Sequence, residues 1–433
     1  MYSLLRLLLM IFVFAPVSQQ VDLSIADGNN IVPETEFVQV DVSMADGNDL
    51  VPETEAVFAV NKFAIDIYKQ VAAGSGNIFF SPYSISSALA MTYGGANGDT
   101  AAEMAKVLHF GDDESTIHVS MNSLRERYDA IPKEQGVFSV ANRLWLDERE
   151  KLIPAYSELV KDYYGAIAGT ADFLNAYDNA RLEINDWVAQ KTRDKIKDLL
   201  QDGDINAQTL LVLVNAVYFN SEWLLPFVKS ATKEEPFRTG KGKQINVPMM
   251  RQTNNFLYSE NADVQWVRIP YKIPGYYLNI FLPRENESFT QLEEFEEKLS
   301  VGALAAWIME AQYCEVNLIM PKFKDEQRYA LAEILKKLGM KLAFGEEADF
   351  SRLVENTLKG GRGIHIDTVI HQAFIELDEE RTEAAAATAV GMRTTAMPIR
   401  TEPVEFRADH PFVYCLTDAN STILFMGRMA LPK

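Results

Sequence analysis

The sequence predicts one large α+β domain whose sheets are mostly buried. Segments with helical spacing of apolar residues are mixed with strand-like apolar runs that do not alternate with polar residues. No Pro-, Gly- or Ser-rich linker interrupts the chain after residue 56, which favours a single domain. With 433 residues, 48% of them hydrophobic and 24% charged, such a domain buries roughly three quarters of the surface of its unfolded chain.

The expected elements follow from the apolar spacing. The first helix starts near Ala56, continues to Val71 and is ended by Gly74 and Gly76. Further helices are expected at 84–93, 100–108, 115–128, 154–164 and 180–192. Strands are expected at 137–146, 210–219, 276–282, 315–322, 412–416 and 423–429. A hairpin connection at 417–422 joins the last two strands.

Residues 1–20 have the composition of a secretory signal peptide. Arg6 precedes the apolar run 7–14, which is too short to span a bilayer. We therefore expect the mature protein to be secreted into the extracellular space. Two Asn-x-Ser/Thr acceptors, Asn286 and Asn420, fit the surface of an exported glycoprotein.

Residues 21–55 form an acidic tandem repeat. The segment 21–36, VDLSIADGNNIVPETE, recurs at 40–55 as VDVSMADGNDLVPETE, and the region 21–61 holds nine acidic residues and no Lys or Arg. Charge repulsion, Asp-Gly pairs and Pro predict a mobile arm rather than packed structure. Two interpretations stay open: the arm binds a basic surface of a protease, or it is a neutral extension.

The overall charge and the cysteines limit the partners and the chemistry. A formal net charge of -20 argues against a nucleic-acid partner and against adhesion to an anionic membrane. Only Cys314 and Cys415 occur, both in apolar strand-like runs. Two unpaired thiols are favoured, because free cysteines are common as small buried hydrophobes; a single bridge stays open in an oxidising compartment.

The sequence offers no support for an enzyme. It contains no G-x-S-x-G, H-E-x-x-H, P-loop or C-x-x-C motif, so no catalytic residue, cofactor or metal site is expected. Four of the five histidines, His109, His118, His365 and His410, are scattered along the chain. Each is expected to be structural or exposed to solvent rather than catalytic.

A segment rich in small residues follows the apolar run 369–378, whose end alternates like a strand emerging from a core. Alanine is a poor strand former, but its small side chain enters between packed strands where larger residues clash. After this segment, Gly391 and two prolines prevent a continuous helix or central strand, so a loop accessible to proteases is expected. The segment includes Glu379, Arg381, Thr382, Glu383, Ala384, Ala385, Ala386, Ala387 and Thr388.

This segment resembles the hinge of the serpin family, and we call its residues the hinge. Four separated segments resemble other parts of the same family. They are residues 77–86 (NIFFSPYSIS), 215–219 (NAVYF), 320–324 (MPKFK) and 409–412 (DHPF). The resemblance implies a serpin-like single domain at 56–433 with large mixed β-sheets, about eight or nine helices and an exposed reactive-centre loop at about 380–405. It also implies trapping of a protease by insertion of the cleaved loop into the central sheet.

The resemblance assigns further residues to two regions of that sheet. Ser81, Ser84, Asn215 and His371 correspond to the polar cluster, called the shutter, through which the opening strands are held. At the top of the sheet, in the region called the breach, it places Trp223 and a pair formed by Lys322 and Glu379. Buried polar groups need mutual partners, so such a cluster stabilises one arrangement and then rearranges.

Two departures from the family pattern bear on function. Arg381 stands where the family has Gly before the Thr of its hinge; if that backbone needs glycine, Arg costs about 1–2 kcal/mol and slows insertion. The usual Lys-Gly after the Tyr-Phe of the sheet strand is Asn220-Ser221 here, which a surface turn tolerates.

Counting thirteen residues from Thr382, as in the family, places the scissile bond at Thr395-Ala396.

The resemblance implies an inhibitor of a serine protease. A small β-branched residue at Thr395 suggests an elastase-like target, whereas the alternative bond Arg393-Thr394 would attract a trypsin-like enzyme. Two other functions stay open: a non-inhibitory serpin acting as a carrier or binding protein, and inhibition of a cysteine protease. We expect the protein to be a monomer. We also expect that it does not bind heparin, because Arg125 and Arg127 are too few positive charges for a polyanion.

Overall fold

The computed structural model describes residues 53–284, 291–355, 364–380 and 402–432. Within these ranges the fold is α+β, as expected, with nine α-helices. The helices are α2 Thr54–Val71, α3 Pro82–Tyr93, α4 Gly98–Leu108, α5 Glu114–Asp129, α6 Pro154–Tyr164, α7 Phe173–Lys191, α8 Gln291–Lys298, α9 Val301–Met309 and α10 Ala332–Leu338. Two 3-10 turns, Lys229–Ala231 and Leu342–Phe344, complete the helical elements of these residues.

The strands form two sheets. The nine-stranded sheet has the order β1-β14-β13-β8-β7-β6-β9-β12, with β5 paired to β6. Its strands are β1 Ile78–Phe80, β5 Lys233–Arg238, β6 Gln244–Glu260, β7 Val264–Pro270, β8 Tyr277–Pro283, β9 Gln312–Pro321, β12 Val404–Arg407, β13 Phe412–Thr417 and β14 Ile423–Met429. The five-stranded sheet has the order β10-β11-β4-β2-β3. Its strands are β2 Gly136–Asp147, β3 Gly169–Ala171, β4 Leu211–Ser221, β10 Phe323–Ala330 and β11 Thr368–Leu377.

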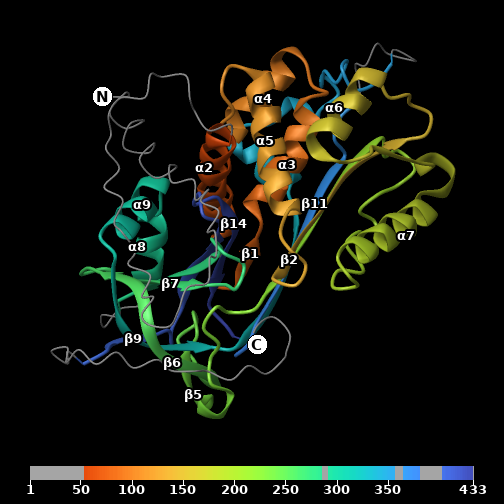
Figure 1. The fold of residues 1–433 in the computed structure, drawn as a ribbon. Coiled ribbons are helices and arrows are strands. Elements are labelled where there is room, and N and C mark those ends of the chain that lie inside the picture. The colour runs from red at the N-terminus through yellow and green to blue at the C-terminus, as the bar shows by residue number, and fades with distance from the viewer. Residues whose placement is uncertain (1–52, 285–290, 356–363, 381–401, 433) are drawn as a thin grey trace, which may run out of the picture.

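The central strands of the five-stranded sheet are covered on both faces, which explains why β4 and β11 do not alternate in polarity. On one face α3 packs against β2, β4 and β14, so this helix lies between the two sheets. On the other face α7 covers β2 (Figure 1). Beneath α7 a separate apolar cluster includes Trp145, Val188 and Phe374.

Helix α3 shows how local sequence sets the position of buried polar groups. Ser81 caps the helix by accepting a hydrogen bond from the Ser84 N–H at 3.2 Å, and Pro82 occupies the first turn, where a missing N–H costs nothing. Every residue of α3 is buried. The serines of its first turn therefore need partners from the neighbouring sheets.

The expected element boundaries were close in some places and wrong in others. The helix at 154–164 and the strand at 423–429 match α6 and β14. Helix α7 begins at Phe173 rather than 180: Asp172 caps a first turn by accepting from the Asn175 N–H, and Ala176, whose backbone is not helical, separates this turn from the rest of the helix. The fold also begins earlier than Ala56: α2 starts at Thr54, and Glu53 is buried, so the end of the second repeat belongs to the folded unit.

The described residues contain two free thiols, Cys314 and Cys415, in line with the favoured prediction. Cys415 is buried on β13, and burial raises the pKa of its thiol to about 12. No described helix combines the length and hydrophobicity that a bilayer span requires. Within the same residues, no three His, Cys, Asp or Glu side chains gather as metal ligands.

Candidate functional site

The centre of the five-stranded sheet contains a parallel strand pair that is open at one end. β11 and β4 are paired from Thr368↔Val212 to Phe374↔Tyr218. Beyond Phe374 the two strands separate: β11 continues to Leu377 along β10, and β4 continues to Ser221 along β2. The chain therefore leaves β11 at the point where the sheet is already forked.

This topology leaves room for one additional strand. A segment that leaves the end of β11 and turns back into the fork runs antiparallel to β11 and also to β4. It would replace one parallel ladder by two antiparallel ladders, which are slightly more stable per residue.

Trp223 lies at the open end of the fork and binds the residues that follow β11. Its Nε1–H donates to the carbonyl oxygen of Asp378 at 2.8 Å, and its backbone N–H donates to that of Glu380 at 3.2 Å. The N–H of Phe227 donates to the Glu379 carbonyl at 2.7 Å. Trp223 is buried and stacks on Tyr271 at 4.5 Å. The segment after β4 thus holds the three residues that follow β11, at the position expected for Trp223.

The side chain of Glu379 makes contacts just beyond the end of β11, where the loop is expected to begin. Its carboxylate lies 3.1 Å from Lys322 Nζ, the expected pairing, and accepts a hydrogen bond from Thr232 Oγ1 at 2.8 Å. Burial acts to raise the pKa of Glu379, but the hydrogen bonds from Thr232 and Lys322 outweigh burial, so the pKa lies below its ordinary value. A further ion pair that was not predicted, Lys229 with Glu380 at 2.7 Å, holds the next residue.

The four residues expected to form the polar cluster do come together. All four side chains are buried with no exposed area. The Ser81 hydroxyl donates to the Leu424 carbonyl on β14 at 2.6 Å, and Asn215 Nδ2 donates to the Ser84 carbonyl and hydroxyl at 2.7 and 2.6 Å. His371 on β11 joins the cluster through both ring nitrogens, one toward Ser81 and one toward Asn215. The cluster therefore links α3 to both strands of the parallel pair.

The hydrogen bonds of His371 define its protonation. The backbone N–H of Ser81 donates to Nε2 at 3.0 Å, so Nε2 carries no proton. The proton is then on Nδ1, which donates to Asn215 Oδ1. Burial lowers the pKa of His371 from 6.5 to about 3, which keeps the ring neutral.

Sequence reasoning missed two members of this cluster, Asn142 and Tyr329. Asn142 on β2 lies directly opposite Asn215 on β4. On the other side, Asn215 lies opposite His371 on β11, and His371 lies opposite Tyr329 on β10. Asn142 Nδ2 donates to the Ser84 carbonyl at 3.1 Å, and the Tyr329 ring stacks on His371. The polar row crosses four strands, and only strand register could have revealed it.

Comparison with known proteins identifies the family. The family model described as Serpin (serine protease inhibitor) matches residues 58–432. This chain belongs to the serpin family. It is 38% identical to the leukocyte elastase inhibitor of Sus scrofa over 86% of this chain and 98% of that protein. An uncharacterized serpin-like protein of Thermococcus kodakarensis is also 38% identical, over 87% of this chain and 86% of that protein. Serpin48 of the insect Tenebrio molitor, described as highly specific, matches with a TM-score of 0.76 and 30% identity, covering 90% of this chain and all of that structure.

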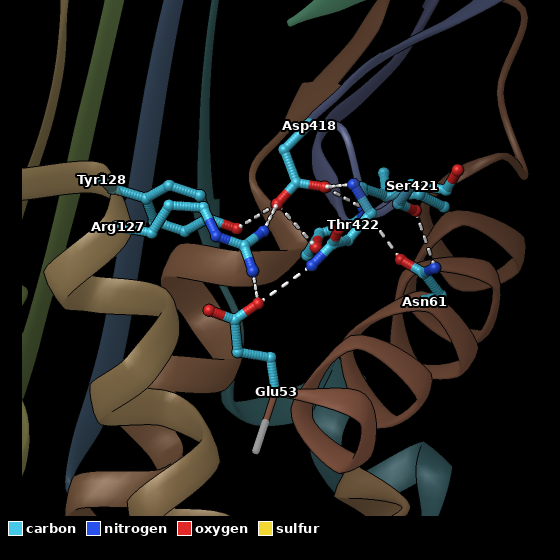
Figure 2. A network of polar contacts seen from close by, with 9 residues as sticks. Glu53, Asn61, Arg127, Tyr128, Asp418, Ser421 and Thr422 are labelled. Atoms are coloured by element: carbon cyan, nitrogen blue, oxygen red, sulfur yellow. Dashed lines mark hydrogen bonds and ion pairs between the residues drawn. The ribbon is translucent and has the colours of Figure 1, made fainter. Parts of the chain in front are cut away.

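In this serpin a second buried network centres on Asp418, in the turn between β13 and β14 (Figure 2). Its carboxylate accepts hydrogen bonds from the Tyr128 hydroxyl at 2.9 Å and from the Thr422 N–H and hydroxyl at 2.8 and 2.9 Å, and lies 3.2 Å from Arg127. Burial raises the pKa of Asp418 despite these partners. The network joins α5 to the last hairpin of the serpin fold.

The same network holds the first described residue of the chain. Glu53 pairs with Arg127 and accepts a hydrogen bond from Asn420 Nδ2 at 2.9 Å (Figure 2). The amide of the proposed glycan acceptor Asn420 is thus occupied in the folded serpin, and a glycan there would displace Glu53. Since Arg127 is engaged by two buried carboxylates, it is not available to a polyanion.

Several predicted site residues of this serpin lie outside the described ranges. They are the hinge positions Arg381, Thr382, Glu383, Ala384, Ala385, Ala386, Ala387 and Thr388, both candidate reactive bonds at residues 393–396, the acceptor Asn286, and residues 1–52. The assignments at these positions remain predictions.

Proposed function

We propose that this serpin is a secreted suicide-substrate inhibitor of a serine endopeptidase. The observation that supports this proposal best is the parallel pair β4–β11, which is forked beyond Phe374, where the chain leaves β11 toward the expected loop. The small side chains of the hinge suit insertion into this fork. The apparent signal at residues 1–20 supports secretion.

The proposed mechanism starts with cleavage of the exposed loop. The protease serine attacks the carbonyl carbon of Thr395, an acyl ester forms, and the amine of Ala396 leaves with a proton from the protease histidine. The freed hinge then inserts between β4 and β11. About ten to fifteen new ladder hydrogen bonds at about 0.5–1.5 kcal/mol each release on the order of 10 kcal/mol.

Insertion moves the attached protease before water can hydrolyse the ester. Distortion that removes a single oxyanion-hole donor slows deacylation by about 100- to 1,000-fold. Neither Trp223 nor the Lys322–Glu379 pair takes part in the chemistry. Their contacts hold the residues that follow β11 in place until cleavage.

The target we favour is an elastase-like enzyme. Thr395 is small and β-branched, and the similarity to leukocyte elastase inhibitors supports a target of that class. Arg393-Thr394 is the alternative bond, for a trypsin-like enzyme.

One residue favours a second function: Arg381, a bulky charge in the hinge, is typical of a non-inhibitory carrier or binding protein.

The test is incubation of the protein with elastase, trypsin, a chymotrypsin-like protease and papain, followed by a denaturing gel and sequencing of the released peptide. We expect a covalent complex with elastase and a peptide that begins at Ala396. A peptide beginning at Thr394 would move the target to trypsin-like enzymes, and a complex with papain alone would indicate cysteine-protease inhibition. Cleavage without any complex would refute the inhibitory function.

A further inference from the structure

The 3-10 turn Lys229–Ala231 and the residue after it place two side chains on consecutive carboxylates beyond the end of β11. Thr232 Oγ1 donates to Glu379, and Lys229 Nζ lies 2.7 Å from Glu380 Oε1. Glu380 is the last described residue before the small residues of the hinge. The turn therefore contacts the chain at the position from which the hinge departs.

The carboxylate of Glu380 depends on Lys229. Its second oxygen, Oε2, is buried and has no hydrogen-bond partner among the described residues. The Glu380 side chain is 19% exposed, whereas that of Lys229 is 58% exposed. The hydrogen bond to Glu380 raises the pKa of Lys229, so the amine is charged at neutral pH. A largely buried negative charge is thus compensated by one amine at the surface.

Insertion of a strand into the fork would separate Lys229 from Glu380. Lys229 belongs to the segment that follows β4, and Glu380 follows β11. A strand that enters between β4 and β11 moves these two strands apart by one further strand spacing, about 4.8 Å. The ion pair, with 2.7 Å between its atoms, does not persist across that additional distance. It therefore stabilises the uninserted state and not the inserted one.

The Lys322–Glu379 pair does not have this property. Lys322 directly precedes β10, which is paired with β11 from its first residue onward. Both partners of that pair thus lie on the β11 side of the fork, and insertion need not part them. Among the described residues, Lys229 and Glu380 form the ion pair that joins the two sides of the fork at its open end.

We propose that Lys229 is a positioning residue that sets the rate at which the fork opens, a role that rests on the function proposed above. Loss of the pair raises the free energy of the uninserted state and so lowers the barrier to insertion. Because Lys229 is exposed, the effect is modest and is screened by salt. Lys229 takes no part in the acyl transfer.

The test adds a peptide with the hinge sequence RTEAAAATAVGM, residues 381–392, to the intact protein. Insertion is followed as a rise in melting temperature with time of incubation, so no protease is needed. At low ionic strength Lys229→Met should accept the peptide about two- to fivefold faster than the wild type. Lys229→Arg keeps the charge and should match the wild type. In about 0.5 M salt the difference between Lys229→Met and the wild type should shrink, which a purely structural role of the side chain would not produce.

Lys272→Met is the matched control. Lys272 pairs with Glu222 at 2.6 Å and is also exposed, but neither residue follows β11, so opening of the fork does not require this pair to break. Its rate of peptide insertion should equal that of the wild type. Equal rates in Lys229→Met and the wild type, or the same acceleration in Lys272→Met, would overturn the role of Lys229 and leave the proposed function intact. If the peptide enters none of the four proteins, the fork does not accept a strand, and the proposed function fails together with the role of Lys229.

Discussion

The backbone N–H of Ser81 donates to Nε2 of His371 at 3.0 Å, and this bond ties the first turn of α3 to the centre of β11. Because an N–H group can donate only to an unprotonated nitrogen, the ring must be neutral for the contact to exist. Protonation would leave two donors facing each other in a buried site. The bond thus makes the contact between α3 and β11 dependent on pH.

We predict that stability falls as the pH drops below 6.5. The folded-state pKa of His371, about 3, is below the ordinary value of 6.5, so between these values the unfolded chain binds the extra proton. The stability that the neutral His371 ring contributes to the fold is fully present above pH 6.5 and is lost progressively as the pH falls toward 3. Between pH 7 and pH 5 the loss from this group is about 2 kcal/mol.

The measurement is urea denaturation of the wild type and of His371→Asn at pH 7 and pH 5. The variant lacks the titrating ring, so its stability should fall by about 2 kcal/mol less over this range than that of the wild type. An equal fall in both proteins would show that other groups carry the pH dependence.

The Lys322–Glu379 pair should stabilise the base of the loop. Lys322→Met leaves the buried Glu379 carboxylate with Thr232 as its remaining side-chain partner, and we expect a loss of about 1 kcal/mol, because Lys322 itself is partly exposed. Lys324→Met is the matched control, since its pair with Glu376 is longer, at 3.8 Å, and exposed. Melting temperatures of the three proteins test this, and an equal effect of the two variants would contradict it.

Replacing Arg381 with glycine should make loop insertion faster. If the inserted hinge needs a glycine backbone, Arg381 costs about 1–2 kcal/mol, which corresponds to about 5- to 30-fold in rate. Arg381→Gly should therefore lower the number of inhibitor molecules consumed for each protease trapped. Arg400→Gly, beyond the proposed scissile bond, controls for loss of a loop charge, and an unchanged stoichiometry in Arg381→Gly would mean that Arg381 is tolerated.

Asp418 should be among the most sensitive positions of the last hairpin. Asp418→Asn keeps the size of the side chain but leaves Arg127 and several hydrogen-bond donors poorly matched in a buried site. We expect a loss of about 3 kcal/mol in the free energy of unfolding, measured by urea denaturation. The control is Asp178→Asn on α7, whose carboxylate is exposed and pairs with Arg181; its effect should be within about 0.5 kcal/mol. Similar losses in the two variants would refute a special role for Asp418.

Much of the site was predictable because its signals are local or motif-based. Apolar spacing located β4, β13 and β14 within one or two residues. The resemblance to serpins selected Ser81, Ser84, Asn215 and His371, and the pair Lys322–Glu379, which the structure brings together. Long strands with mixed polarity, such as β6 at Gln244–Glu260, were missed because their apolar residues follow neither the spacing of a helix nor the alternation of a half-buried strand.

The sequence by itself determined that the chain has a run of small residues after a strand, an acidic tandem repeat and a mixed α+β fold, because composition and spacing are properties of neighbouring residues. Only the tertiary structure decided where the β4–β11 ladder ends, that Asn142 and Tyr329 extend the polar cluster, and that Glu53 belongs to the fold. These features depend on strand register and on contacts between distant segments. Packing of the whole chain sets both, and no local pattern encodes them.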